Sequence, residues 1–156
     1  MFTAVGLFAF LICLDMGLKQ YVDDTMETGE TKDLNLGMFE LRKVYNNGFV
    51  MGYLDKHPDL IRAGSILAAA ILTAYDSTLF AEKGRRLHKI GMATLSAGAY
   101  SNLYDRLIRG KLIDYIGVTE GPKQIQKLTF NLADCYIIFG TVLSELTRQR
   151  RKKKKK

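Results

Sequence analysis

Four apolar segments, separated by strongly charged connections, constrain the fold of this chain more than any other feature of its sequence. They cover residues 1–18, 60–75, 90–104 and 130–144. A confident membrane span needs about 18 uninterrupted apolar residues, and none of the four segments reaches that length. The segments therefore fit either a helical bundle in water or a bundle of membrane spans.

The charges of the connections favour the membrane bundle. Residues 82–89 hold four Lys or Arg residues and one acid, and a basic tail follows at 148–156, whereas residues 21–59 hold eight acids and four bases. Cytoplasmic loops of membrane proteins carry an excess of Lys and Arg, a rule that a bundle in water has no reason to follow. The sequence thus predicts a mainly α membrane protein with both termini in the cytoplasm and four transmembrane helices, at about 1–21, 60–80, 87–104 and 130–147.

The connections on the outer side carry strand signals. Residues 34–45 and 49–54 flank Asn46-Asn47-Gly48, where Asn and Gly tolerate the positive φ values of a tight hairpin. A second extended pair is expected at 111–118 and 124–130. We therefore predict a β-rich external loop at about 30–56 and a small extracytoplasmic sheet, within a single membrane-embedded domain of residues 1–147.

Composition excludes several classes of function. The net charge is +7, but the tail at 148–156 supplies eight positive charges, which is more typical of anchoring to membrane lipids than of nucleic-acid binding. Cys13 and Cys135 have no paired spacing and are expected to be buried and inert, and only His57 and His88 could offer imidazole. We expect no metal site and no nucleic-acid partner.

Several charged residues fall at one depth of the predicted bundle, near its outer face. These are Asp15, Lys19, Arg62, Asp105, Arg106 and Asp134. A charge at the bilayer centre costs about 2.5 to 3.5 kcal/mol on insertion scales, so their convergence predicts a shared functional site. Asp15 and Lys19 are four residues apart on a helix and can form an ion pair, and Asp105 can pair with its neighbour Arg106.

Paired acids are the remaining candidates for chemistry. No Ser or Cys lies in a nucleophile signature, whereas Asp114 and Asp134 each follow a polar motif at the outer level. Two carboxyl groups held close together do not both ionise, so one keeps a proton while the other acts as a base. This is the arrangement that an aspartyl protease needs.

In these motifs the chain resembles the lipoprotein signal peptidase (signal peptidase II) family along nearly its whole length. The matching features occur in the family's order. They are Asp15 with Lys19, the Asn-x-Gly segment Asn46-Asn47-Gly48, the run Asn102-Leu103-Tyr104-Asp105-Arg106-Leu107 followed by Gly110 and Ile113-Asp114-Tyr115, and Phe130-Asn131-Leu132-Ala133-Asp134.

The resemblance implies a site and an activity. Asp114 and Asp134 would form the catalytic dyad that activates water against the scissile amide. The substrate would be a prolipoprotein, cut before its diacylglyceryl-modified cysteine at the outer leaflet of a bacterial inner membrane, by a monomer without a cofactor. Residues that would support the dyad or bind substrate are Asp15, Lys19, Asn46, Gly48, Asn102, Asp105, Arg106, Asn131 and Ala133.

Local readings and rival functions stay open at this point. Asn131 also fits a simple helix cap three residues before Asp134. The family's Gly-Ala-Ala-Phe reads Gly48-Phe49-Val50-Met51 here, which leaves open a paralogue with altered substrates or a binding-only role, although retention of both acids weighs against it. Intramembrane acids also occur in small ion or proton transporters, but residues 63–74 and 90–103 carry only scattered Ser and Thr, a poor proton path.

Overall fold

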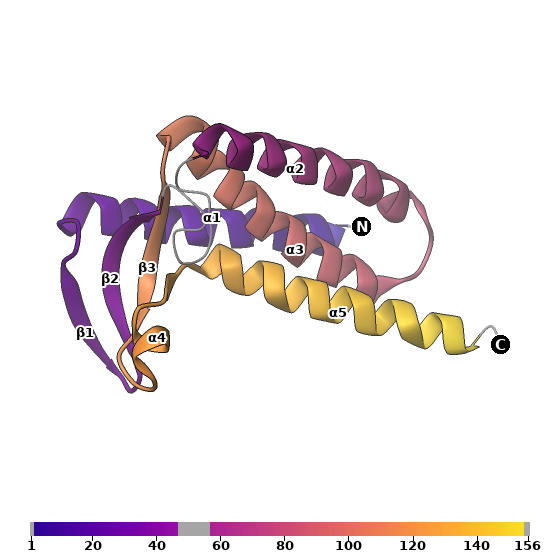
Figure 1. Cartoon of the computed structure of the whole chain (residues 1–156). Helices are drawn as coiled ribbons and strands as arrows, with labels where there is room; N and C mark the ends of the chain where they lie inside the picture. Colours follow the sequence, from indigo (N-terminus) through magenta and orange to yellow (C-terminus); the bar gives the residue numbers. More distant parts are fainter. Residues whose placement is uncertain (1, 47–56, 155–156) are drawn as a thin grey trace.

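Four long helices pack side by side into a bundle, with a small sheet at one end of it (Figure 1). The computed structural model describes residues 2–46 and 57–154. The long helices are α1 (Phe2–Thr25), α2 (Pro58–Ala81), α3 (Arg86–Tyr104) and α5 (Leu132–Lys154). The mainly helical architecture with a small antiparallel sheet is confirmed.

Helix α3 is the central helix, and it packs against α1, α2 and α5. Its contact with α5 is close because small residues face each other across it. A Cβ atom on Gly91 would lie 2.8 Å from the backbone nitrogen of Ser144, and one on Gly98 would meet the carbonyl oxygen of Ala133. Small residues at such crossings let two backbones approach, as in membrane helix pairs.

The outer faces of the helices are strongly apolar. Helix α2 buries only Ile61, Ala69 and Leu79. Monomeric proteins in water rarely expose large continuous apolar patches, whereas a lipid environment favours them. Large apolar side chains that face outward on α1, α2 and α5 include Val5, Phe10, Leu14, Leu60, Ile66, Leu67, Ile71, Ile138, Phe139 and Val142.

Within the described residues, two helices are long and apolar enough to cross a membrane. They are Thr3–Thr25, with a mean hydropathy of 1.5, and Pro58–Ala81, with a mean hydropathy of 1.3. Crossing by α3 and α5 stays a prediction. The expected burial of both thiols is wrong, since Cys13 is exposed and Cys135 half-buried. Their apolar surroundings in the sequence reflect the outward faces of α1 and α5, not a protein core.

The sheet has four antiparallel strands in the order β1 (Thr31–Leu36), β2 (Phe39–Asn46), β3 (Leu112–Val118) and β4 (Thr129–Phe130). The predicted single strand at 34–45 is wrong, because the chain turns between β1 and β2, where Gly37 has a φ of 66°. The predicted strand at 49–54 lies outside the described residues.

Of the second predicted pair of strands, only the first strand is confirmed. Strand β3 occupies the predicted range 111–118. Most of the range 124–130 is not extended: Gly121-Pro122 leads into the short helix α4 (Lys123–Gln126), which leaves two residues for β4. Pro fits the start of a helix because its missing N–H would have no partner there.

Candidate active site

Asp114 lies on β3 and is 2 % exposed. In the β2–β3 register Asn46 faces Leu112, so Asp114 is its diagonal neighbour on the same face of the sheet. The Asn46 amide reaches across this diagonal and donates Nδ2–H to Asp114 Oδ2 at 3.0 Å. The hairpin strand therefore supplies a hydrogen-bond donor to one candidate catalytic acid.

Asp134 lies in the first turn of α5, and Asn131 joins it to Asp114. The backbone N–H of Asp134 donates to Asn131 Oδ1 at 3.0 Å, and the N–H of Asn131 donates back to Asp134 Oδ2 at 3.1 Å. The same Asn131 side chain donates Nδ2–H to Asp114 Oδ1 at 2.8 Å. The predicted helix cap is confirmed, and Asn131 also joins the two acids, since its backbone N–H binds the Asp134 carboxyl group and its side chain binds the Asp114 carboxyl group.

The backbone N–H groups of Leu132 and Ala133, which have no acceptor within α5 because they lie in its first turn, also donate to side chains. Leu132 N–H donates to the Tyr115 hydroxyl at 3.2 Å, and Ala133 N–H donates to Asp15 Oδ1 at 3.2 Å. Tyr115 in turn donates its O–H to Asp15 Oδ1 at 2.9 Å. A carboxylate is favourable at a helix N-terminus. These bonds from α1 and β3 fix the turn that carries Asp134.

Lys19 is fully buried and connects α1 to α3 and to the segment that follows α3. Its Nζ lies 2.8 Å from Asp15 Oδ2 and 2.9 Å from Asp105 Oδ2. It also donates to Asn102 Oδ1 at 2.8 Å, which orients that amide so that Nδ2–H donates to Asp134 Oδ1 at 2.9 Å. The predicted Asp15–Lys19 pair is confirmed, and it is one part of a larger network.

The predicted pairing of Asp105 with Arg106 is wrong. Asp105 Oδ1 instead pairs with Arg109 Nη1 at 2.8 Å, in the π-helix η2 (Asp105–Arg109) that follows α3. Adjacent side chains on a helix point in different directions, whereas residues four apart share a face. Within the described chain, the Arg106 guanidinium has no hydrogen bond or ion pair.

The charges of the site balance only if one acid keeps its proton. Burial raises the pKa of Asp114 to about 6, and the nearby charge of Asp134 adds to this, while the hydrogen bond from Asn46 opposes it. Four carboxyl groups face three basic side chains, so one proton shared by Asp114 and Asp134 makes the cluster neutral. The members are Asp15, Asp105, Asp114, Asp134, Lys19, Arg106 and Arg109.

The structure brings together nearly all of the predicted site residues. Seven of them contact the dyad or each other: Asp15, Lys19, Asn46, Asn102, Asp105, Asn131 and Ala133. Gly48 lies outside the described residues. The sequence prediction assigned no role to Tyr115, Ser101 or Arg109. Strand alternation beside Asp114 is a signal that could have found Tyr115, because it directs that side chain to the opposite face.

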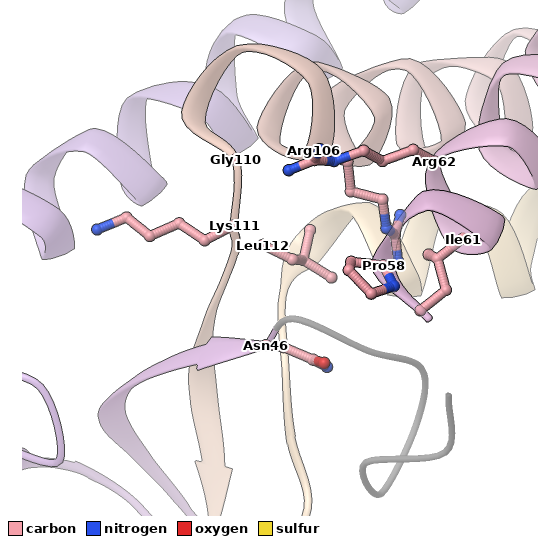
Figure 2. Close-up of a pocket in the computed structure, with 8 residues that line it drawn as sticks. All are labelled: Asn46, Pro58, Ile61, Arg62, Arg106, Gly110, Lys111 and Leu112. Carbon is pink, nitrogen blue, oxygen red and sulfur yellow. The ribbon is translucent and has the colours of Figure 1, made fainter. Parts of the chain in front are cut away.

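A pocket of about 270 Å³ lies where the end of β2, the start of α2 and residues 110–112 meet (Figure 2). Asn46 lines it and also binds Asp114, so the pocket and the candidate catalytic acid are neighbours. Arg106, the predicted site residue without a partner among the described residues, lies here. The full lining is Asn46, Pro58, Ile61, Arg62, Arg106, Gly110, Lys111 and Leu112.

Fold and site together define a helical protein with an apolar exterior and two carboxyl groups, one buried and one half-buried, that Asn131 joins at the sheet end of the bundle. The fold is that of bacterial membrane enzymes. One such enzyme, solved by the in meso method at 2.3 Å, superposes with a TM-score of 0.84 at 20 % identity, over 100 % of this chain and 93 % of that one. A second, solved at 1.9 Å, gives a TM-score of 0.75 at 19 % identity, over 94 % and 92 %.

The chain belongs to the signal peptidase (SPase) II family, whose sequence model matches residues 7–147. The lipoprotein signal peptidase of Fusobacterium nucleatum is 31 % identical over 139 residues, which cover 89 % of this chain and 81 % of that protein. The lipoprotein signal peptidase of Ralstonia nicotianae is 31 % identical over 153 residues, covering 94 % and 86 %. The family resemblance drawn from the motifs is confirmed.

Proposed function

We propose that this protein is an aspartyl endopeptidase of the bacterial inner membrane that removes signal peptides from prolipoproteins. The cut falls before the diacylglyceryl-modified cysteine, and the enzyme acts as a monomer without a cofactor. One observation carries the assignment: Asn131 forms direct hydrogen bonds to two carboxyl groups, the buried Asp114 and the half-buried Asp134. Membership of the signal peptidase II family supports the substrate class.

The reaction uses the dyad with one proton. The ionised carboxylate takes a proton from water as the water oxygen attacks the scissile carbonyl carbon, and the protonated acid hydrogen-bonds the carbonyl oxygen. The tetrahedral intermediate collapses, the C–N bond breaks, and a proton passes to the leaving nitrogen. The balance of the site's charges and the raised pKa of Asp114 support this protonation state.

The surrounding network keeps both acids in position through the reaction. Lys19 acts on Asp134 through the oriented Asn102 amide, and Asn46 donates to Asp114. Arg106 has no ion-pair partner in the described chain, so its guanidinium is available to bind an acceptor group of the substrate. Fixed donors of this kind favour the charge that develops during amide cleavage, because they need no reorganisation.

The active site lies at the outer leaflet in our proposal, with four membrane spans and both termini in the cytoplasm. The dyad, the sheet and the C-terminal end of α1 lie at the same end of the bundle (Figure 1). The basic connection at 82–89 lies at the opposite end. A bilayer site suits this substrate, because the signal helix and the acyl chains are already dissolved in lipid.

Three variants test the dyad: Asp114→Asn, Asp134→Asn and the double variant. Each single variant should lose about 10²- to 10⁴-fold in the rate of precursor cleavage, because Asn cannot exchange a proton with water or with the leaving nitrogen. The double variant should be scarcely slower than either single one, since the acids act as a unit. The measurement is cleavage of a diacylglyceryl-modified precursor by purified protein in detergent.

Asp33→Asn is the matched control. It replaces the same carboxyl group by the same amide, at an exposed position of β1 away from the site. It should cleave at the wild-type rate. Thermal unfolding of every variant separates loss of chemistry from loss of fold. Near-normal cleavage by Asp114→Asn or Asp134→Asn would remove the aspartyl-protease assignment.

A further inference from the structure

The pocket beside the dyad is lined by three basic residues and, among the described residues, by no acid. Two of the basic side chains face it. Arg62 reaches from the outer end of α2 towards Gly110, where its Nη2 lies 3.9 Å from the position of a Cβ atom (Figure 2). Arg106 approaches the same space from η2. The pocket is therefore a cationic recess formed by two guanidinium groups.

The third basic residue does not add its charge to this recess. Lys111 lines the pocket with its backbone, and its side chain points away from it (Figure 2). The Lys111 ammonium lies 3.4 Å from the centroid of the Tyr45 ring, a cation–π contact on the other side of the strand. Recognition by the pocket thus depends on Arg62 and Arg106.

The positive charge of the recess is compensated only by loose or longer-range contacts, since Asp134, Asp114 and Asp105 act on Arg106 without a direct ion pair. Arg106 has no ion pair within the described chain. Arg62 has one loose contact, at 3.6 Å, with the 95 % exposed carboxylate of Asp59. Water screens such a pair strongly, so it holds Arg62 weakly. Two guanidinium groups that share one small space favour an anion that both can bind.

Size and position limit what this anion can be. The volume of about 270 Å³ is below the roughly 300 to 1,000 Å³ of pockets that enclose a whole small ligand, and fits one side chain. Asn46 lines the pocket and donates to Asp114. Because Asn46 belongs to the pocket and also contacts Asp114, a residue near the scissile bond of a peptide cut at the dyad is close enough to reach the two arginines.

We propose that Arg62 and Arg106 form a subsite for a carboxylate side chain of the substrate, on the residue that directly follows the modified cysteine. The inference rests on the proposed peptidase function. The signal helix stays in the bilayer while the mature chain leaves towards the outer side, where the first turn of α2 and the end of β2 border the pocket. Arg62 is then a residue that determines specificity, and the enzyme prefers precursors with Asp or Glu next to the modified cysteine.

The test compares two synthetic lipidated precursors that differ only in Asp or Asn directly after the modified cysteine. Wild-type protein should cleave the Asp precursor with a kcat/KM about 3- to 10-fold higher, the range expected for a partly exposed arginine–carboxylate pair. Arg62→Gln should remove this preference by slowing only the Asp precursor. Asp59→Asn, which frees Arg62 from its loose partner, should increase the preference.

Lys83→Gln is the matched control, because it removes one exposed positive charge at the opposite end of the bundle. It should keep the wild-type preference. Equal slowing of both precursors by Arg62→Gln, or equal wild-type rates on both, overturns the subsite.

A phospholipid phosphate is the competing occupant, and lipid composition distinguishes it. If Arg62→Gln affects both precursors equally, and only in vesicles that contain phosphatidylglycerol and not in pure phosphatidylcholine, the pocket binds lipid and the substrate subsite is wrong. Cleavage of the Asn precursor by wild-type protein tests the peptidase function separately. Failure there removes the proposed function, whereas failure of the preference alone removes only the subsite.

Discussion

Removal of the buried Lys19 charge should destabilise the fold more than any surface charge substitution. Its Nζ lies 2.8 Å from Asp15 and 2.9 Å from Asp105, and all three side chains are fully buried. In Lys19→Met the hydrophobic stem is largely kept, but two buried carboxylates lose their shared cation. Breaking a buried ion pair by removing one partner typically costs about 3 to 5 kcal/mol.

This cost converts to a measurable thermal shift. For a chain of this size, 1 kcal/mol corresponds to about 2 to 4 °C in Tm, so Lys19→Met should unfold about 6 to 20 °C lower than wild type in the same detergent. Lys32→Met is the matched control. Lys32 pairs with Glu30 at 3.2 Å on the surface and is 46 % exposed, so its loss should shift Tm by about 2 °C or less.

A double variant identifies charge as the cause. Lys19→Met with Asp15→Asn restores a neutral cluster, because Arg109 still balances Asp105. The new Asn can keep its oxygen towards Ala133 N–H and turn its amide towards Ser101 Oγ, which now accepts. The double variant should recover about 1 to 3 kcal/mol of the loss. A Tm change below about 3 °C in Lys19→Met, or strictly additive effects in the double variant, would refute the reasoning.

Two further predictions concern titration and topology. Asn46 donates to the Asp114 carboxylate and so opposes the burial that raises the pKa of Asp114 to about 6. Asn46→Ala should therefore move the Asp114 limb of the pH–rate profile to higher pH by about one unit, while Asn35→Gly, at a φ of 52° in β1, should leave it in place. A limb displaced to lower pH would contradict this sign. Reporters fused at the C-terminus and within 82–86 should be cytoplasmic, and one within 25–32 external. A cytoplasmic signal from 25–32 would disprove the four-span topology.

The sequence was most informative where a motif fixes both residue type and spacing. Asn131 and Asp134 are three residues apart at a helix start, so their reciprocal backbone bonds follow from local geometry alone. The contact between Asn131 and Asp114 depends on how β3 meets α5, and no local rule gives it. The ordered family motifs nevertheless include both residues of this contact.

The errors arose where several local signals competed. The segment at 34–45 contains enough apolar and β-branched residues for one strand, but Gly37 adopts a positive φ and divides it into β1 and β2. Pairing of Asp105 with Arg106 was inferred from adjacency, whereas the helix directs Asp105 to Arg109 and Lys19. In the first case the backbone of Gly37 decides the direction of the chain, and in the second case the helix decides the direction of the Asp105 side chain.

The distribution of the site over separate elements has a consequence for folding and catalysis. Asp114 is on β3, Asp134 is on α5, and Lys19 reaches both α3 and α1 partners. Neither β3 nor the first turn of α5 holds a basic residue that could neutralise its own carboxyl group. The carboxyl pair therefore becomes stable only when the sheet and the helices have met, and the proton that the dyad keeps is the one that makes the assembled cluster neutral. The protonation state needed for cleavage is in this way a property of the complete fold.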